Sequence, residues 1–228
     1  MPLYLQNSLG YTALQAGSVF LPVGIIQGIM SPVSGFLSSK INPKIPMILG
    51  MCLLGFSFFI NSKLSFLTEH DFIMTSLYIR GFGMGILFTP LSALSLLTIQ
   101  REQMAQASAI TNTIRQIAGS IGVALFTTVL TARVNFHMQT FGNAIQSGTQ
   151  EFKNVLSNMT FFIQSHGGST MATAIKQGQS IMISNVSKQA YIQGIDDDFL
   201  IAALITALGL IPTIILHSRR NTTQTKNV

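Results

Sequence analysis

The chain has 228 residues, of which 48% are hydrophobic and only 9% are charged. A soluble domain carries about 25% charged residues and a disordered chain needs low hydrophobicity, so this composition argues against both classes. The net charge of +6 would suit nucleic-acid binding, but the 13 Lys and Arg residues form no basic face, so we expect no nucleic-acid partner. In a membrane protein, such an excess is typical of cytoplasmic loops.

Five long stretches almost free of charged residues predict helices that cross a lipid bilayer. A crossing needs about 20 mostly apolar residues, and in lipid every backbone polar group must be paired within the segment, as in a helix. Met1–Gln6 resembles the last turns of a further helix, so we predict that the chain is a fragment or the product of an internal start. In chain order, the predicted complete spans are Ala13–Leu37, Ile45–Ile60, Phe72–Thr98, Met104–Ala132 and Phe199–Leu216.

The short connections between these spans differ in charge. Six of their eight Lys and Arg residues lie on one side, in 38–44, 100–103 and 217–228, whereas Lys63 and Arg133 lie on the other. Connections rich in Lys and Arg stay in the cytoplasm. The sequence therefore predicts a multi-pass protein of the inner (plasma) membrane, with its N-terminus outside and its C-terminus in the cytoplasm.

A polar segment between the fourth and fifth spans is too long for a simple connection. Apolar residues recur at helical spacing in 152–162 and more weakly in 171–186, so we expect two amphipathic helices on or near the outer membrane face. They are either a cap without a partner or a docking surface for an extracytoplasmic partner. We therefore divide the chain into a transmembrane bundle (1–132), an extracytoplasmic loop (133–198), and the last transmembrane helix with a cytoplasmic tail (199–228).

No constellation typical of an enzyme is present. The four His residues lie in loops or at span ends and never in a metal-ligand spacing, and a single Cys excludes a disulfide framework. Gly81–Gly85 (GFGMG) lies within a predicted span and lacks the strand and the downstream acid of a dinucleotide site. We expect no catalytic residue, metal or cofactor.

Two arginines, Arg80 and Arg115, are each the only charge in their span. An Arg in the membrane costs at least about 2.5–3.5 kcal/mol and usually faces a cavity or a partner. Arg80 is close enough to the outer side to snorkel, whereas Arg115 lies about 16 Å beyond the cytoplasmic start of its helix. Its polar neighbours either line an aqueous pathway or make structural hydrogen bonds between helices. The candidates for the transport pathway are Arg115, Asn112, Gln116, Ser108, Arg80 and, more weakly, Gln27.

Glycine and proline are frequent within the predicted spans. In water they would argue against helices, but in membrane bundles they are tolerated, and small residues let helix backbones approach closely. We interpret most of them as packing or kink positions and a few as hinges. The candidates are Gly35, Pro32, Gly81, Gly83, Gly85, Pro90, Gly119 and Gly122.

Acidic residues are absent from all five predicted spans. A proton-driven transporter needs a titratable carboxylate or His within the membrane. The sequence therefore predicts that this chain does not couple protons by itself.

Several stretches together resemble the second half of the fourteen-helix drug:proton antiporter branch of the major facilitator superfamily. They are PLYLQNSLGYTALQAG, SPVSGFLSSKINPK, RGFGMGILFTPLSAL, ASAITNTIRQIAGSIGVAL and QAYIQGIDDDFLIAAL. The stretch GFLSSKINPK is similar to a decayed copy of a cytoplasmic motif of that family, with Ser39 at the position of its acid, Lys40 at that of its Arg and Asn42 at that of its Gly.

The resemblance implies an all-α membrane protein, the superfamily's C-terminal helix bundle, with about five complete transmembrane helices and the remnant of a sixth. It implies export of small lipophilic or cationic compounds by alternating access, together with a missing N-terminal half. In Gram-negative relatives it also implies a periplasmic adaptor protein. The alternative is a truncated, non-transporting membrane remnant or interaction subunit.

Overall fold

The structure is a computed structural model that describes residues 1–228 except 8, 66–67, 97–98, 147–149, 168–169 and 216–228. The described residues form helices and no strand, and five of these helices are long and apolar enough to cross a membrane. The predicted all-α class is therefore confirmed. The elements are α1 (Pro2–Asn7), α2 (Ala13–Lys40), α3 (Lys44–Asn61), α4 (His70–Leu96), the 3₁₀ turn η1 (Arg101–Gln103), α5 (Met104–Gln146), α6 (Gln150–Gly167) and α7 (Met171–Ile215).

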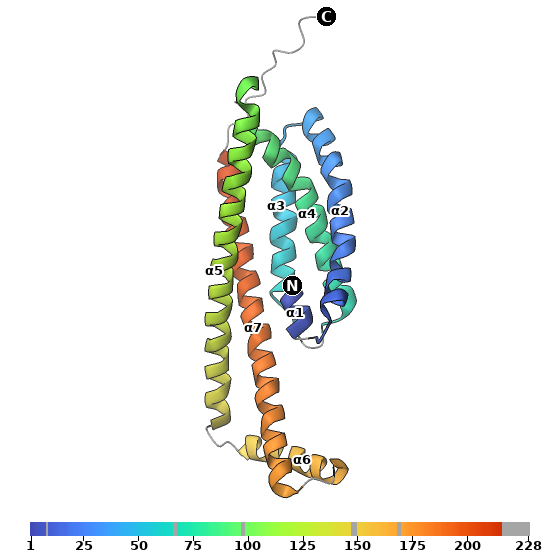
Figure 1. Cartoon of the computed structure of the whole chain (residues 1–228), viewed down its shortest axis with the longest axis vertical. Coiled ribbons are helices and arrows are strands. Elements are labelled where there is room, and N and C mark those ends of the chain that lie inside the picture. The colour runs from blue at the N-terminus through green and yellow to red at the C-terminus, as the bar shows by residue number, and fades with distance from the viewer. Residues whose placement is uncertain (8, 66–67, 97–98, 147–149, 168–169, 216–228) are drawn as a thin grey trace, which may run out of the picture.

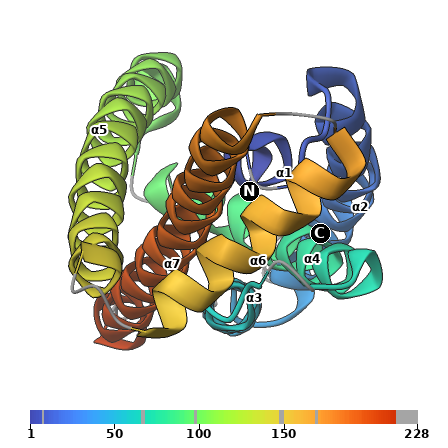
Figure 2. The same ribbon diagram turned by 90° about the horizontal axis from the view of Figure 1, so that it is seen from below.

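Helices α2, α3 and α4 form one tightly packed group, with α1 at the end where α2 begins (Figure 1). Helices α5 and α7 form an antiparallel pair, and α7 attaches this pair to the group through α3. Helix α6 lies across the free end of the pair, as the view from below shows (Figure 2). The ends of α2, α4 and α7 that the sequence assigns to the cytoplasm all lie at the same end of the molecule.

Glycine allows the close packing of α4 against its two neighbours. A Cβ on Gly85 would lie 2.7 Å from the Cβ of Met30, and one on Gly81 would lie 3.1 Å from the Val23 carbonyl oxygen, both on α2. On the opposite side, a Cβ on Gly50 of α3 would lie 2.9 Å from the Gly83 carbonyl oxygen. Larger side chains would force these helices apart, so this glycine-rich stretch sets the spacing of the group.

Hydrogen bonds between buried side chains and backbone reinforce the same contacts. Ser34 of α2 donates to the Ile86 carbonyl oxygen at 2.5 Å, and Ser57 of α3 donates to the Ser76 carbonyl oxygen at 2.9 Å. Ser76 in turn donates to Asn61 Oδ1 at 2.8 Å. In lipid these polar groups have no water to bind, so their pairing fixes the rotation of each helix about its axis.

The long helices α5 and α7 cross the boundaries at 132 and 198 without a break. They contain 43 and 45 residues, which gives each a length of about 65 Å, roughly twice the hydrocarbon thickness. Their polar ends therefore project past the α1–α4 group (Figure 1). The weakly periodic stretch 171–186 forms the first part of α7, whereas 152–162 lies in the separate helix α6. The predicted tail and the span ends Thr98 and Leu216 lie outside the described residues.

Candidate functional site

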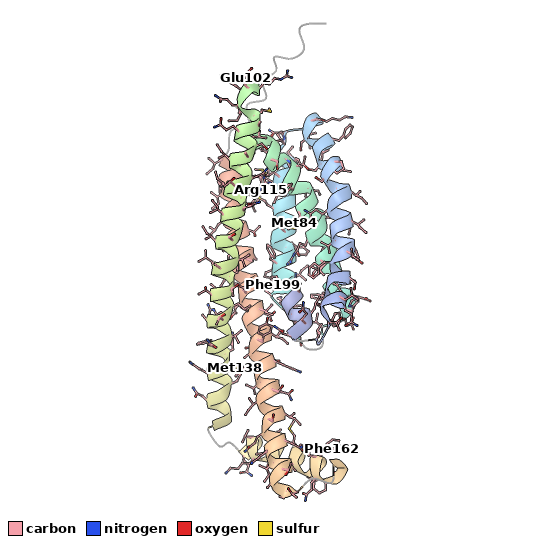
Figure 3. All side chains as sticks on the ribbon, in the orientation of Figure 1. Met84, Glu102, Arg115, Met138, Phe162 and Phe199 are labelled. Carbon is pink, nitrogen blue, oxygen red and sulfur yellow. The ribbon has the colours of Figure 1, made fainter. Side chains whose placement is uncertain are left out.

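Arg115 joins α5 to α4 in the half of the molecule nearest the C-terminal end (Figure 3). Its Nη2 donates to Ser92 Oγ at 3.3 Å, and its guanidinium carbon lies 4.6 Å from the centre of the Phe88 ring. The side chain is half-buried. A cation held by one hydroxyl and one aromatic face keeps several N–H groups available to a further ligand.

The other members of the polar stripe surround Arg115 only in part. Asn112 and Gln116 are exposed on α5, and Ser108 is half-buried one turn further toward the start of the helix. Gln27 lies elsewhere, on α2, where its backbone closely approaches Gly85 of α4. The structure thus places Arg115 and Ser108 toward the bundle and leaves the two amides free on the surface of α5.

Arg80 occupies a different environment nearer the opposite end of α4. Its guanidinium carbon lies 4.8 Å from the Phe58 ring of α3 and 5.5 Å from the Phe199 ring of α7. Its Nε and Nη2 are buried and have no hydrogen-bond partner among the described residues. Arg80 is therefore held by aromatic faces within the bundle rather than extended toward the outer surface. It lies eight to twelve residues, or about 12–18 Å, along α4 from the positions that Arg115 contacts.

The eight small-residue candidates also fall into two sets. Gly35, Gly81, Gly83 and Gly85 meet atoms of a neighbouring helix, and Pro90 is buried. A Cβ on Gly119 or Gly122 of α5 would meet nothing within 4 Å. Pro32 is exposed within an unbroken α2. The glycines of α4 therefore serve contacts inside the chain, whereas those of α5 lie on an open face.

A cluster of polar and charged residues near the middle of α7, where this helix meets α5, was missed by sequence reasoning. Asp197 Oδ2 lies 2.9 Å from His137 Nε2 and 3.8 Å from Arg133 Nε, both on α5. The helices meet closely here, because a Cβ on Gly194 would lie 2.6 Å from Val134 Cγ2. The signal was available in the sequence, since three of the seven acidic residues are consecutive, at 196–198.

The two flanking aspartates form no ion pair within the described part of the chain, although the amino group of Met1 lowers the pKa of Asp198 and so opposes the effect of burial. Asp196 is half-buried, and its Oδ1 accepts the backbone N–H of Leu64 at 3.1 Å. Burial, together with the adjacent Asp197, raises the pKa of Asp196 to about 7, although the Leu64 hydrogen bond opposes this change. Burial also raises the pKa of Asp198 to about 6. The predicted spans contain no acidic residue, but the last span, Phe199–Leu216, begins directly after these three aspartates.

A groove of about 560 Å³ lies between α6 and the start of α7. Phe161 is 75% exposed beside it, and Lys153 and Gln164 supply polar atoms at its rim. A Cβ on Gly178 of α7 would lie 3.3 Å from Leu156 Cδ1, so the glycine allows the two helices to pack closely. The predicted docking surface on this segment stays a prediction.

Residues 1–123 match the family model described as Major Facilitator Superfamily. The chain belongs to the major facilitator superfamily. The predicted family is thereby confirmed, and the protein is a multi-pass membrane protein of a transporter family rather than of an enzyme family.

Similar proteins of this superfamily come from several bacteria. The chain is 32% identical over 220 residues to the uncharacterized MFS-type transporter YhcA of Bacillus subtilis, covering 96% of this chain and 41% of that protein. It is 26% identical to the fatty acid resistance protein FarB of Neisseria gonorrhoeae, with 94% and 40% covered. It is 33% identical to the multidrug export protein EmrB of Escherichia coli K12, with 60% and 27% covered. The chain thus spans about two fifths of the length of the first two.

Proposed function

We propose that this chain forms the C-terminal part of a proton-coupled multidrug efflux antiporter that works by alternating access in the inner (plasma) membrane. Its C-terminus would lie in the cytoplasm, and small lipophilic or cationic compounds would be its substrates. The names of FarB and EmrB, a resistance protein and an export protein, support this proposal. An N-terminal half would complete the transporter, because the chain spans only about two fifths of FarB.

The observation that carries the proposal is the placement of Arg115. A guanidinium between apolar membrane helices costs free energy of insertion. Such groups are retained where they bind a substrate, an ion or a partner. Arg115 donates one N–H to Ser92 Oγ, and its guanidinium lies over the Phe88 ring. The same geometry lets Ser92 and Phe88 position the cation while its remaining donors stay available to the transport pathway.

The exposed apolar face of α5 supports the proposal that a helix of an N-terminal half packs against it. Apolar side chains along α5 are largely exposed, among them Ile114, Ile121 and Val123. Gly119 and Gly122 lie between them and leave room for a close helix contact. A long apolar face of this kind fits lipid or the N-terminal half of the transporter. The exposed segment around α6 would offer a periplasmic adaptor protein a surface to bind.

The second candidate is a truncated, non-transporting remnant or interaction subunit. The incomplete coverage of the relatives favours it. An export assay with residues 1–228 alone separates the two: proton-dependent efflux by the chain alone would contradict the remnant reading. No efflux after co-expression with an N-terminal half from a similar transporter such as YhcA would contradict the transporter proposal.

The role of Arg115 is tested in the complemented transporter by efflux of a lipophilic cationic dye. We expect Arg115→Gln to reduce efflux at least tenfold at equal membrane content and Arg115→Lys to retain part of it, because Lys keeps the charge without the planar fork. Arg101→Gln is the matched control, since Arg101 lies exposed in η1. Equal efflux by Arg115→Gln and wild type would refute the assignment.

A further inference from the structure

Three consecutive aspartates near the middle of α7 point in three directions. Successive residues on a helix are rotated by about 100°, so neighbouring side chains cannot share one partner. Asp197 turns to α5, where it meets His137, and Asp196 turns to the connection between α3 and α4, where it meets Leu64. Asp198 Oδ1 is buried and has no hydrogen-bond partner among the described residues.

The polar and charged partners nearby are distributed unequally. Helix α5 supplies Arg133 and His137, and both contact Asp197. After α3, Lys63 holds its ammonium over the Phe59 ring at 5.3 Å. Tyr4 of α1 lies near Asp196 and the amino group of Met1 lies near Asp198, whereas Arg80 of α4 lies against the Phe199 ring.

The three adjacent carboxylates differ in what stabilises their charge. Asp197 lies beside Arg133 and His137, and like-charge repulsion from Asp197 disfavours the charged form of Asp196. Asp196 has a single backbone N–H and partial burial, and Asp198 has burial without a bond. The proton is therefore retained on the flanking residues.

We propose that Asp196 and Asp198 form a proton-binding site near the middle of α7, in which Asp196 is the group that exchanges a proton with the extracytoplasmic side. The coupling of this exchange to export rests on the function proposed above. The site lies far from Arg115 along the bundle, so proton and substrate would bind at different places in the same chain.

Protonation of Asp196 changes a contact between helices. A carboxylate accepts the Leu64 N–H more strongly than a neutral carboxyl does, because charge-assisted hydrogen bonds are about twice as strong. Proton uptake therefore loosens the tie between α7 and the α3–α4 connection, and proton release tightens it. The pKa of Asp196 near 7 and that of Asp198 near 6 put this exchange within the physiological pH range.

The site is tested by infrared titration of the protonated carboxyl absorption, with the 228-residue chain in lipid nanodiscs between about pH 5 and pH 8. We expect a wild-type transition with a midpoint near 7 that disappears in Asp196→Asn. Asp71→Asn is the matched control, because Asp71 is an exposed aspartate at the same end of the molecule, on α4. Asp198→Asn should remove the more acidic part of the transition.

Two results would overturn the proposal: no transition in the wild type, or an unchanged transition in Asp196→Asn. If Asp196→Asn does not fold by circular dichroism, Asp196→Glu decides, since it keeps a titrating group and must shift the midpoint. The complemented transporter then gives the second measurement, the pH dependence of dye efflux. Absent efflux with an intact titration refutes the proposed function alone, whereas efflux with an unchanged pH profile in Asp196→Asn refutes its coupling to this site.

Discussion

The α2–α4 group and the α5–α7 pair are built in opposite ways. In the first, glycines bring backbones within contact distance and buried Ser residues fasten neighbouring helices. In the second, two long helices pack against each other, expose most of their apolar side chains and carry a charged cluster where they meet, and α7 also packs extensively against α3. The group is a closely packed frame, whereas the pair is joined to it mainly through α7.

The largest effect is expected from a side chain added inside the frame. Gly50→Ala places a Cβ 2.9 Å from the Gly83 carbonyl oxygen and from the backbone nitrogen of Leu87, and backbone atoms cannot move aside cheaply. We expect a loss of about 1–3 kcal/mol of stability, as in overpacked cores, measured by thermal unfolding in detergent. Gly119→Ala, on the open face of α5, should leave the melting temperature unchanged; equal losses would erase the distinction between the regions.

A smaller loss is expected at the crossing of the pair. Gly194→Ala would place its Cβ 2.6 Å from Val134 Cγ2 and 3.1 Å from the Val134 backbone nitrogen. We expect about 1 kcal/mol of destabilisation, most of it recovered when Val134→Ala is added. A double-mutant cycle of thermal unfolding measures this. Full additivity of the two changes would show that the contact does not couple the helices.

Stability should also depend on pH through Asp196. Its pKa is about 7 in the folded protein and about 3.8 when unperturbed, so between these values the folded state holds a proton that the unfolded state has lost. The free energy of unfolding therefore falls as pH rises across this window. Asp196→Asn should flatten this part of the melting-temperature profile and melt above the wild type beyond pH 7. A profile parallel to that of wild type would contradict the assignment.

The smallest effect is expected for the partner of Asp197. His137→Ala removes the 2.9 Å contact but leaves Arg133 at 3.8 Å. Because Asp197 is 37% exposed, water replaces much of the loss, and we expect at most about 1 kcal/mol. The same thermal-unfolding measurement checks it, with His70→Ala as the control at an exposed histidine. A loss of stability as large as that of Gly50→Ala would mean that the α5–α7 contact stabilises the fold as much as the packing of α2–α4 does.

The membrane helices could be predicted from the sequence because charge and hydropathy are local properties. The predicted starts Ala13 and Met104 coincide with the starts of α2 and α5. Their polar continuations could not be read in the same way, since α5 and α7 stay helical outside the apolar stretch by packing on each other. Polar composition therefore indicated a loop where the chain forms helix.

The environments of the charged residues depend on contacts between distant parts of the chain. Arg115 was found because a lone charge in an apolar helix is visible in the sequence. The rings of Phe58 and Phe199 around Arg80, and the Leu64 N–H that meets Asp196 across 132 positions, are fixed only by tertiary packing. The aspartates were visible as a run of three, but their unequal partners were not.

The uninterrupted length of α7 has a mechanical consequence. From Asp198 back to Met171 the helix extends about 40 Å, so a tilt of about 10° about Asp198 would displace α6 by about 7 Å. A small tilt of α7 near the aspartates thus produces a larger displacement of α6. Whatever molecule touches α6 would sense the state of the membrane bundle without contacting it.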